Sequence, residues 1–253
     1  MIESCCTTLE QALSAQARGA GRIELCTDLP VGGVTPPRDL IAAVVHALTI
    51  PVNVLIRPDS SKTLCVSLPE RLATLDPSHA VHGPLPLTVP RVACFRERNT
   101  PASDLDESER SIGFVYSEGE IQQMIADIEF CKTVGVAGIV VGALTPAGAI
   151  DVAALRRLVA AAQPLPVTFH RAFDVCTEDP FDALEKIIDA GCTRLLTSGM
   201  AETAWDGRDL IARLVLRAGE RLIILAGRGV NPENINSLAA VTGAREFHGT
   251  ALP

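Results

Sequence analysis

Short apolar runs recur along the chain. Each is followed by a turn rich in Gly, Pro, Asn or Asp and then by a segment with helical spacing. Apolar runs bounded by such turns are typical of buried β-strands. The predicted strands are 2–6, 22–26, 52–57, 138–142, 167–170, 194–198, 222–227 and 245–248. The predicted helices between them are 8–18, 37–47, 117–133, 151–162, 179–190, 203–218 and 231–241.

Residue types at the ends of the helical segments support this assignment. Good N-cap residues precede three of the helices, and in two cases a Pro follows at the first helical position. These N-caps are Asp151, Asp179 and Asn231. Glycines, which commonly end helices, stand where four of the segments should stop. They are Gly19, Gly135, Gly191 and Gly219.

Strands that alternate with helices predict an α/β fold with a parallel sheet. An open doubly wound sheet is one arrangement, and a closed TIM-type (β/α)8 barrel is the other. Eight strand–helix units in about 250 residues, without a G-x-G-x-x-G motif after the first strand, favour the barrel. We therefore expect one barrel domain over residues 1–253, and we expect it to lack an eighth helix because little sequence follows the last strand.

The segment 59–111 breaks this rhythm, because neither a helical nor a strand period holds along it. Seven of the 17 prolines lie between Pro58 and Pro101. The segment is too long for an ordinary connection between a strand and a helix, so it is either a functional lid or an insert. Its apolar residues are few and scattered, which favours a disordered insert after the third strand.

Composition narrows the class of protein. The net charge is −8 and no basic run occurs, which argues against binding to nucleic acid or to an anionic membrane. The longest uncharged stretch, Thr133 to Ile150, contains several glycines and reads as a strand between loops. The N-terminus has no signal-peptide pattern, so we expect a cytoplasmic protein whose eight cysteines stay reduced.

Alternation along the strands predicts which side chains enter the barrel. Successive side chains point to opposite faces, and the large apolar ones should face the helices. In 167–170, Val167 and Phe169 then point outward, while Thr168 and His170 point inward. The same reasoning directs polar residues of four other strands inward: Glu3, Cys5, Glu24, Cys26, Asn53, Arg57, Glu246 and His248.

A single inward histidine or glutamate is more often structural than functional. So many ionisable groups in one interior, however, carry a desolvation cost that simple packing would avoid. Active sites of TIM-type barrels lie at the carboxyl ends of the strands. We therefore predict a polar functional pocket there, in which the candidate acids, bases and orienting groups are Glu24, His170, Asp174, Glu246 and His248.

This pocket suits an enzyme that acts on a small phosphorylated or carboxylated substrate. Arg57 and Arg171 are candidates for holding the anion, together with Ser198 and the turn at Gly227 and Gly229. No lysine stands at a strand end, which disfavours Schiff-base aldolase chemistry, while lyase, isomerase and hydrolase reactions stay open. The Glu/His set could also bind a harder divalent ion such as Mn(II) or Zn(II).

Several motifs resemble the CutC family, which is named for copper homeostasis. They are "ESCC" (3–6), "GAGRIELC" (19–26), "GGVTPP" (32–37), "IPVNVLIRP" (50–58), "FVYSEGEI" (114–121), "GIVVGAL" (138–144), "LPVTFHRAFD" (165–174), "RLLTSG" (194–199) and "EFH" (246–248). The resemblance implies a TIM-type barrel, a cytoplasmic location and a role in copper handling. Two departures from the family pattern are the insert and the missing final helix, for which a gene-model error is one hypothesis.

The resemblance directs attention to Cys5 and Cys26, which end adjacent predicted strands. Two thiolates at comparable height could hold Cu(I) in near-linear coordination, since cysteine selects soft ions. The alternative is that both residues are small buried hydrophobes, and no C-x-x-C motif supports a metal site. We also expect apolar surface beside the last and first strands, and therefore a homo-oligomer.

Overall fold

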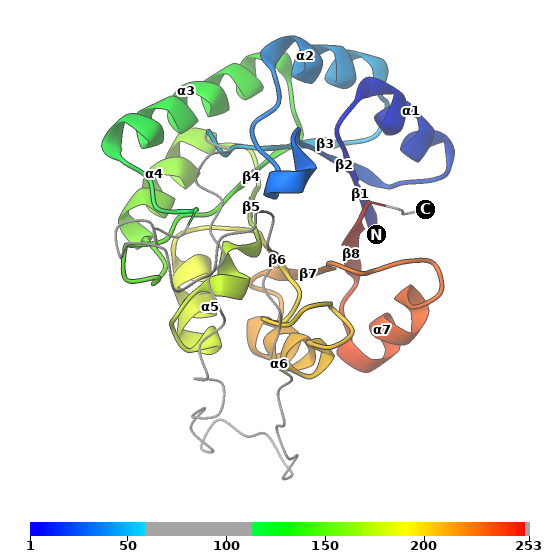
Figure 1. Ribbon diagram of the computed structural model, residues 1–253, viewed down its shortest axis with the longest axis vertical. Helices are drawn as coiled ribbons and strands as arrows, with labels where there is room; N and C mark the ends of the chain where they lie inside the picture. Colours follow the sequence, from blue (N-terminus) through cyan, green and yellow to red (C-terminus); the bar gives the residue numbers. More distant parts are fainter. Residues whose placement is uncertain (59–112, 251–253) are drawn as a thin grey trace, which may run out of the picture.

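The structure is a computed structural model that describes residues 1–58 and 113–250 of the chain. Eight parallel strands pair in sequence order, and β8 returns to pair with β1, so that the sheet closes into a barrel (Figure 1). The strands are β1 (Ile2–Cys6), β2 (Arg22–Leu25), β3 (Val52–Leu55), β4 (Gly138–Val141), β5 (Val167–Phe169), β6 (Arg194–Thr197), β7 (Ile223–Gly227) and β8 (Glu246–Gly249).

Helices surround the barrel and connect successive strands. In the described ranges they are α1 (Leu9–Ala17), α2 (Arg38–Ala47), α3 (Glu118–Val134), α4 (Val152–Ala162), α5 (Pro180–Asp189), α6 (Arg208–Ala218) and α7 (Ile235–Thr242). Short 3-10 helices follow β2 and β5, namely η1 (Leu29–Val31) and η6 (Arg171–Val175). The predicted TIM-type barrel and the order of its elements are confirmed.

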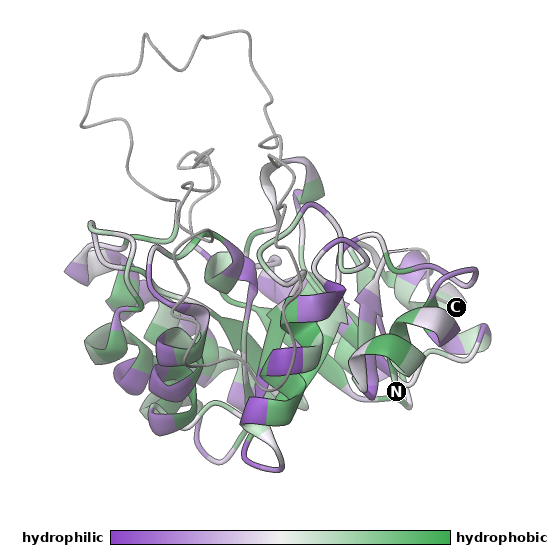
Figure 2. Cartoon of the chain, turned by 90° about the horizontal axis from the view of Figure 1, so that it is seen from below, coloured by the Kyte–Doolittle hydropathy of each residue, from purple (hydrophilic) through white to green (hydrophobic). Residues whose placement is uncertain are grey.

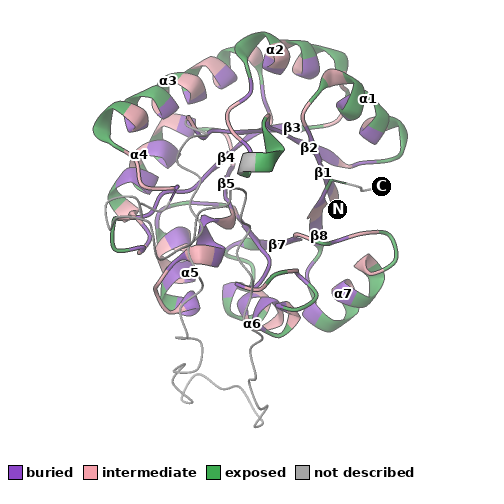
Figure 3. Ribbon diagram, in the orientation of Figure 1, coloured by how far each residue is buried: buried purple, intermediate pink, exposed green. Residues whose placement is uncertain are grey.

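The main hydrophobic core lies between the strands and the helices. Outward-pointing strand residues such as Ile23, Val54 and Phe169 pack there and are fully buried. Figure 2 shows hydrophilic and hydrophobic residues alternating along the helices, and Figure 3 shows that the outer sides of the helices are the exposed ones. Each helix therefore has one apolar face, and the strands have their own apolar residues on the side that meets it.

Capping residues begin several helices as predicted. The side chains of Asp151 and Asp179 accept hydrogen bonds from the first turns of α4 and α5. The prediction for Asn231 was wrong, because α7 begins after Asn234. The side chain of Asn231 instead accepts hydrogen bonds from the backbone of Glu233 and Asn234, which holds a turn ahead of the helix.

Two predictions lie outside the described residues. The expected insert at 59–111 falls within the segment 59–112, and the described chain ends at Thr250, directly after β8. Within those limits, the outer face of β8 is less open than expected, since Phe247 is 5% exposed. In the part of the chain that the structure describes, no helix is long and apolar enough to cross a membrane.

Candidate functional site

Two thiols meet inside the barrel near the carboxyl ends of adjacent strands. Cys5 lies in β1, Cys26 directly follows β2, and their sulfur atoms are 3.5 Å apart. Both residues are buried in an interior cluster with Leu55 and Val140, separate from the outer core. Cys6 belongs to the outer core instead. The inward direction predicted for the pair is therefore confirmed.

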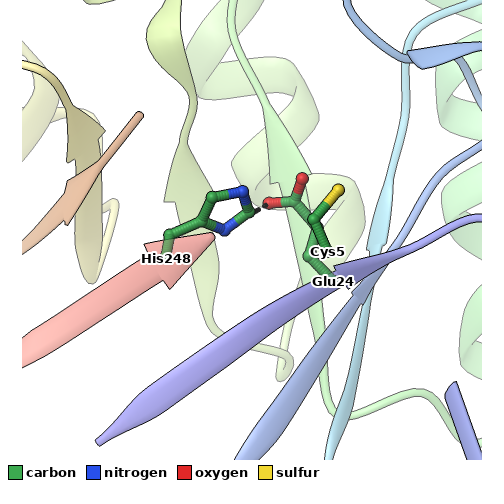
Figure 4. A group of neighbouring side chains, drawn as sticks. All are labelled: Cys5, Glu24 and His248. Carbon is green, nitrogen blue, oxygen red and sulfur yellow. Dashed lines mark ion pairs between the residues drawn. The ribbon is translucent and has the colours of Figure 1, made fainter. Parts of the chain in front are cut away.

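A carboxylate and an imidazole lie beside the thiols. Cys5 of β1 pairs in register with Glu24 of β2, and His248 reaches the same place from β8 (Figure 4). One potential ligand atom from each of these three residues lies within 4.8 Å of the other two. The Oε2 atom of Glu24 is buried and has no hydrogen-bond partner among the described residues. These donor types can hold a soft or borderline metal ion.

Glu3, two residues before Cys5 in β1, contacts this group through His248. Its carboxylate is fully buried and accepts hydrogen bonds from the side chains of Arg22 and Asn53. It also lies 2.9 Å from Nδ1 of His248, its register partner across the pairing of β1 with β8. Burial alone would raise the pKa of Glu3, but His248 and Arg22 together lower it, so the carboxylate is ionised.

Burial and neighbouring charges also shift the pKa values of Glu24, His248 and Cys5. Burial raises the pKa of Glu24 to about 7. Burial opposes protonation of His248, but the carboxylates of Glu24 and Glu3 outweigh it and raise the pKa of that ring. The hydrogen bond with Cys26, together with burial, raises the pKa of Cys5 well above its ordinary value. In the absence of a metal ion, Cys5 is therefore a neutral thiol at physiological pH.

Glu246 lies inside the barrel but not in the mouth. It is the first residue of β8, and its Oε2 accepts hydrogen bonds from Arg22 at 2.7 Å and Arg194 at 3.0 Å. These arginines are the first residues of β2 and β6, so the three groups meet at the amino end of the barrel. The prediction that Glu246 stands at the carboxyl ends was wrong. Arg22 lies two residues before Glu24 in β2, so its side chain points to the same face of the strand. This signal could have placed Arg22 inside the barrel, but the sequence prediction did not include it.

A second group of polar residues lies around His170, which directly follows β5. Its Nδ1 accepts a hydrogen bond from the backbone of Ala172 at 3.1 Å. Burial and then the charge of Arg57 lower its pKa to about 3, so the ring is neutral and its hydrogen is on Nε2. That buried atom has no partner within the described ranges. The group presents an N–H donor beside cationic side chains and could bind a small anion.

Arg57 reaches this group from the end of β3. Its guanidinium donates to the carbonyl of Gly33 at 2.9 Å and lies over the ring of Phe114 at 5.0 Å. The Phe114 ring in turn contacts His170, with the ring centroids 4.8 Å apart. Phe114 was not among the predicted site residues, because aromatic residues at the start of a segment carry no specific signal of their own.

Asp174 holds the loop that follows β6. It accepts hydrogen bonds from the Thr197 hydroxyl, from the backbone of Ser198 and Met200, and from Arg171 at 2.9 Å. The Ser198 hydroxyl lies 3.0 Å from the same carboxylate and 2.7 Å from the carbonyl of Ala201. Asp174 thus orients Arg171, while the Ser198 hydroxyl is engaged by Asp174 and by its own loop.

The two predicted glycines allow close packing. At Gly227, a Cβ atom would lie 3.2 Å from Cβ of His248 and 2.5 Å from a methyl group of Leu196. Gly229 has a φ of +71°, and a Cβ there would lie 3.1 Å from the side chain of Thr203. Gly227 therefore makes room for His248, whereas a phosphate site at this turn stays a prediction.

Comparison with known proteins identifies relatives of the whole chain. The model of the CutC family matches residues 1–69 and 99–252. A family protein CutC from Parabacteroides distasonis is 41% identical over 253 residues, which cover 99% of this chain and 82% of that protein. A family protein CutC from Histophilus somni is 38% identical over 250 residues, with the same coverage of 99% and 82%.

Solved structures agree with this result. A CutC from Streptococcus agalactiae, provisionally named a copper homeostasis protein, matches with a TM-score of 0.75 and 27% identity, covering 100% of this chain and 99% of that one. The aldolase QR15 has a TM-score of 0.58 at 10% identity and covers 98% of this chain and 89% of its own, which shows likeness of fold alone. With a family model along most of its length and relatives above a third identical, the chain belongs to the CutC family.

Proposed function

We propose that the protein binds Cu(I) in the cytoplasm as part of copper homeostasis, with Cys5 and Cys26 as its thiolate ligands. The observation that carries the proposal is the 3.5 Å separation of two buried sulfur atoms at the carboxyl ends of adjacent strands. Thiolates are soft ligands that select Cu(I). The name of the relative from Streptococcus agalactiae supports the same role.

The surroundings of the thiol pair also fit a bound cation. Two cysteines that served only as small hydrophobes would be surrounded by apolar side chains. Here Leu55 and Val140 belong to the same buried cluster, but the carboxylate of Glu24 and the imidazole of His248 also lie within reach of Cys5. Binding would release the thiol protons, and the positive ion would compensate the buried negative charge.

The proposal is tested by replacing both thiols. We expect the variant with Cys5→Ser and Cys26→Ser to lose stoichiometric Cu(I) uptake, measured under reducing conditions in competition with a strong Cu(I) chelator. Cys6→Ser is the matched control, because Cys6 is also buried in β1 but faces the helices. Unchanged uptake by the double variant would refute the proposal.

A second candidate function is catalysis on a small anionic substrate. The observation that favours it is the buried Nε2 of His170, which has no hydrogen-bond partner among residues 1–58 and 113–250 and lies in the positive field of Arg57 and Arg171. We expect inorganic phosphate or a small carboxylate to raise the melting temperature of the full chain, and Arg171→Ala to remove that effect. An equal shift in both proteins would show that the anion binds elsewhere and would count against this candidate.

A further inference from the structure

The spacing of the two sulfur atoms does not fit the near-linear coordination expected from the sequence. Metal–thiolate bonds are about 2.3 Å long in zinc sites, so two collinear bonds of that length would separate the sulfurs by about 4.6 Å. The observed separation of 3.5 Å corresponds to a bend at the metal of about 100°. An ion held at this sulfur spacing would therefore keep an open side on which further ligands can bind.

The carboxylate of Glu24 is placed to fill part of that side. Glu24 is opposite Cys5 in the pairing of β1 with β2, and it is buried with its Oε2 atom unpartnered among the described residues. A buried polar atom without a partner is rare in proteins and calls for a specific explanation. Nδ1 of His248 lies 3.9 Å from this oxygen, which is beyond hydrogen-bond distance. A cation held by the neighbouring thiolates would give this oxygen a close contact.

The imidazole of His248 is a second potential metal ligand. Its hydrogen bond with Glu3 determines which ring nitrogen can bind the metal. Nδ1 lies 2.9 Å from the carboxylate of Glu3, which already accepts from Arg22 and Asn53. An ionised carboxylate can only accept, so Nδ1 carries a hydrogen and donates it. In the neutral ring the lone pair is then on Nε2. A carboxylate that holds a histidine in this way is the usual support of a metal ligand.

The group of Cys5, Glu24 and His248 needs only a small contraction to coordinate an ion, and Cys26 adjoins it through the 3.5 Å contact between its sulfur atom and that of Cys5. Ligand atoms of Cys5, Glu24 and His248 lie within 4.8 Å of one another (Figure 4). With bonds of about 2.0–2.3 Å, tetrahedral ligands lie roughly 3.5 Å apart. The side chains come from three adjacent strands of a closed sheet, β2, β1 and β8, which fixes their backbones, so rotation of side chains alone must provide the difference.

We propose that the thiol pair is half of a Cys–Cys–His–Glu metal site, in which Nε2 of His248 and the carboxylate of Glu24 complete the coordination and Glu3 is a positioning residue for His248. This inference rests on the proposed function and extends it. Two sulfurs, one nitrogen and one oxygen form a four-coordinate set that suits Zn(II). The site therefore binds Zn(II) as well as Cu(I).

The test compares the affinity of the reduced full chain for Zn(II), measured by competition with a colorimetric chelator, in wild type and His248→Asn. The asparagine amide can still donate to Glu3, but it has no atom in place of Nε2. We expect at least a tenfold loss of affinity in this variant, and for Glu3→Gln a loss of about 10–100-fold, as for other outer carboxylates of metal sites. His46→Asn on the exposed side of α2 is the control and should bind as wild type does.

Absorption spectra of the Co(II)-loaded proteins separate coordination from a general structural effect. Wild type should show sulfur-to-cobalt charge transfer together with tetrahedral ligand-field bands. His248→Asn should keep the charge transfer but shift the ligand-field bands, whereas Glu3→Gln should give the wild-type spectrum at reduced affinity. Glu24→Gln provides a second ligand variant in case His248→Asn does not fold, and it too should shift those bands.

The outcomes distinguish the two proposals. If His248→Asn and Glu24→Gln are folded and keep the Zn(II) affinity and Co(II) spectrum of wild type, the four-ligand site is refuted, and Cu(I) binding by the thiols is unaffected. If the variant lacking both thiols still takes up Cu(I), the proposed function fails, whatever the Zn(II) results. Loss of Zn(II) affinity in the ligand variants, with the control unchanged, supports the inference.

Discussion

At the scale of single residues, the buried ring of His170 predicts how stability depends on pH. Burial and Arg57 lower its folded-state pKa to about 3, below the 6.5 of an unperturbed histidine. Between these values the unfolded chain binds a proton that the folded chain does not. The contribution of the neutral His170 ring to the free energy of unfolding is therefore fully present above pH 6.5. It is lost as the pH falls toward 3, by about 1.4 kcal/mol per pH unit.

Substitution of His170 isolates this effect. In His170→Asn the amide oxygen can still accept from Ala172, but the side chain no longer titrates. From pH 7.5 to 5.5, the free energy of unfolding of wild type should fall by about 1.4 kcal/mol more than that of the variant. Urea unfolding at both pH values measures the difference. Equal slopes in wild type and His170→Asn would contradict the prediction.

The direction of inward side chains could be predicted from the sequence, but their height in the barrel could not. Alternation along the strands correctly predicted that the side chains of Cys5, Glu24 and His248 point inward. It also predicted an inward direction for Glu246, but the ion pairs of this residue with Arg22 and Arg194 show that it lies at the amino end of the barrel. Parity has a period of two and carries no information about the stagger between strands, which sets the height of each residue.

At the scale of elements, strands could be predicted more closely than the starts of helices. The predicted strand 2–6 matches β1 (Ile2–Cys6), because the turn residues that flank an apolar run mark where the strand begins and ends. The predicted helix 231–241 begins four residues too early relative to α7 (Ile235–Thr242). Asn231 and the proline after it suit a helix start and a turn equally well, and here the side chain of Asn231 stabilises the turn.

At the scale of the whole molecule, the exposed apolar residues near the closure of the barrel lead us to predict self-association. The helices α7 and α1 flank the pair β8–β1, and no helix lies between them within the described residues (Figure 1). Val241 of α7 is 50% exposed and Leu13 of α1 is 41% exposed. Two exposed apolar side chains on helices that flank one gap favour contact with a second copy of the chain.

Light scattering checks this prediction against the monomer mass of 26.8 kDa. We expect wild type to be mainly oligomeric, and Val241→Lys combined with Leu13→Lys to shift it toward monomer at the same concentration. Leu216→Lys is the control, because Leu216 is 75% exposed but lies on α6, away from the closure. If the control dissociates the oligomer as well as the double variant does, the contact lies elsewhere. A monodisperse wild-type monomer would show that the surface beside β8 and β1 needs no partner.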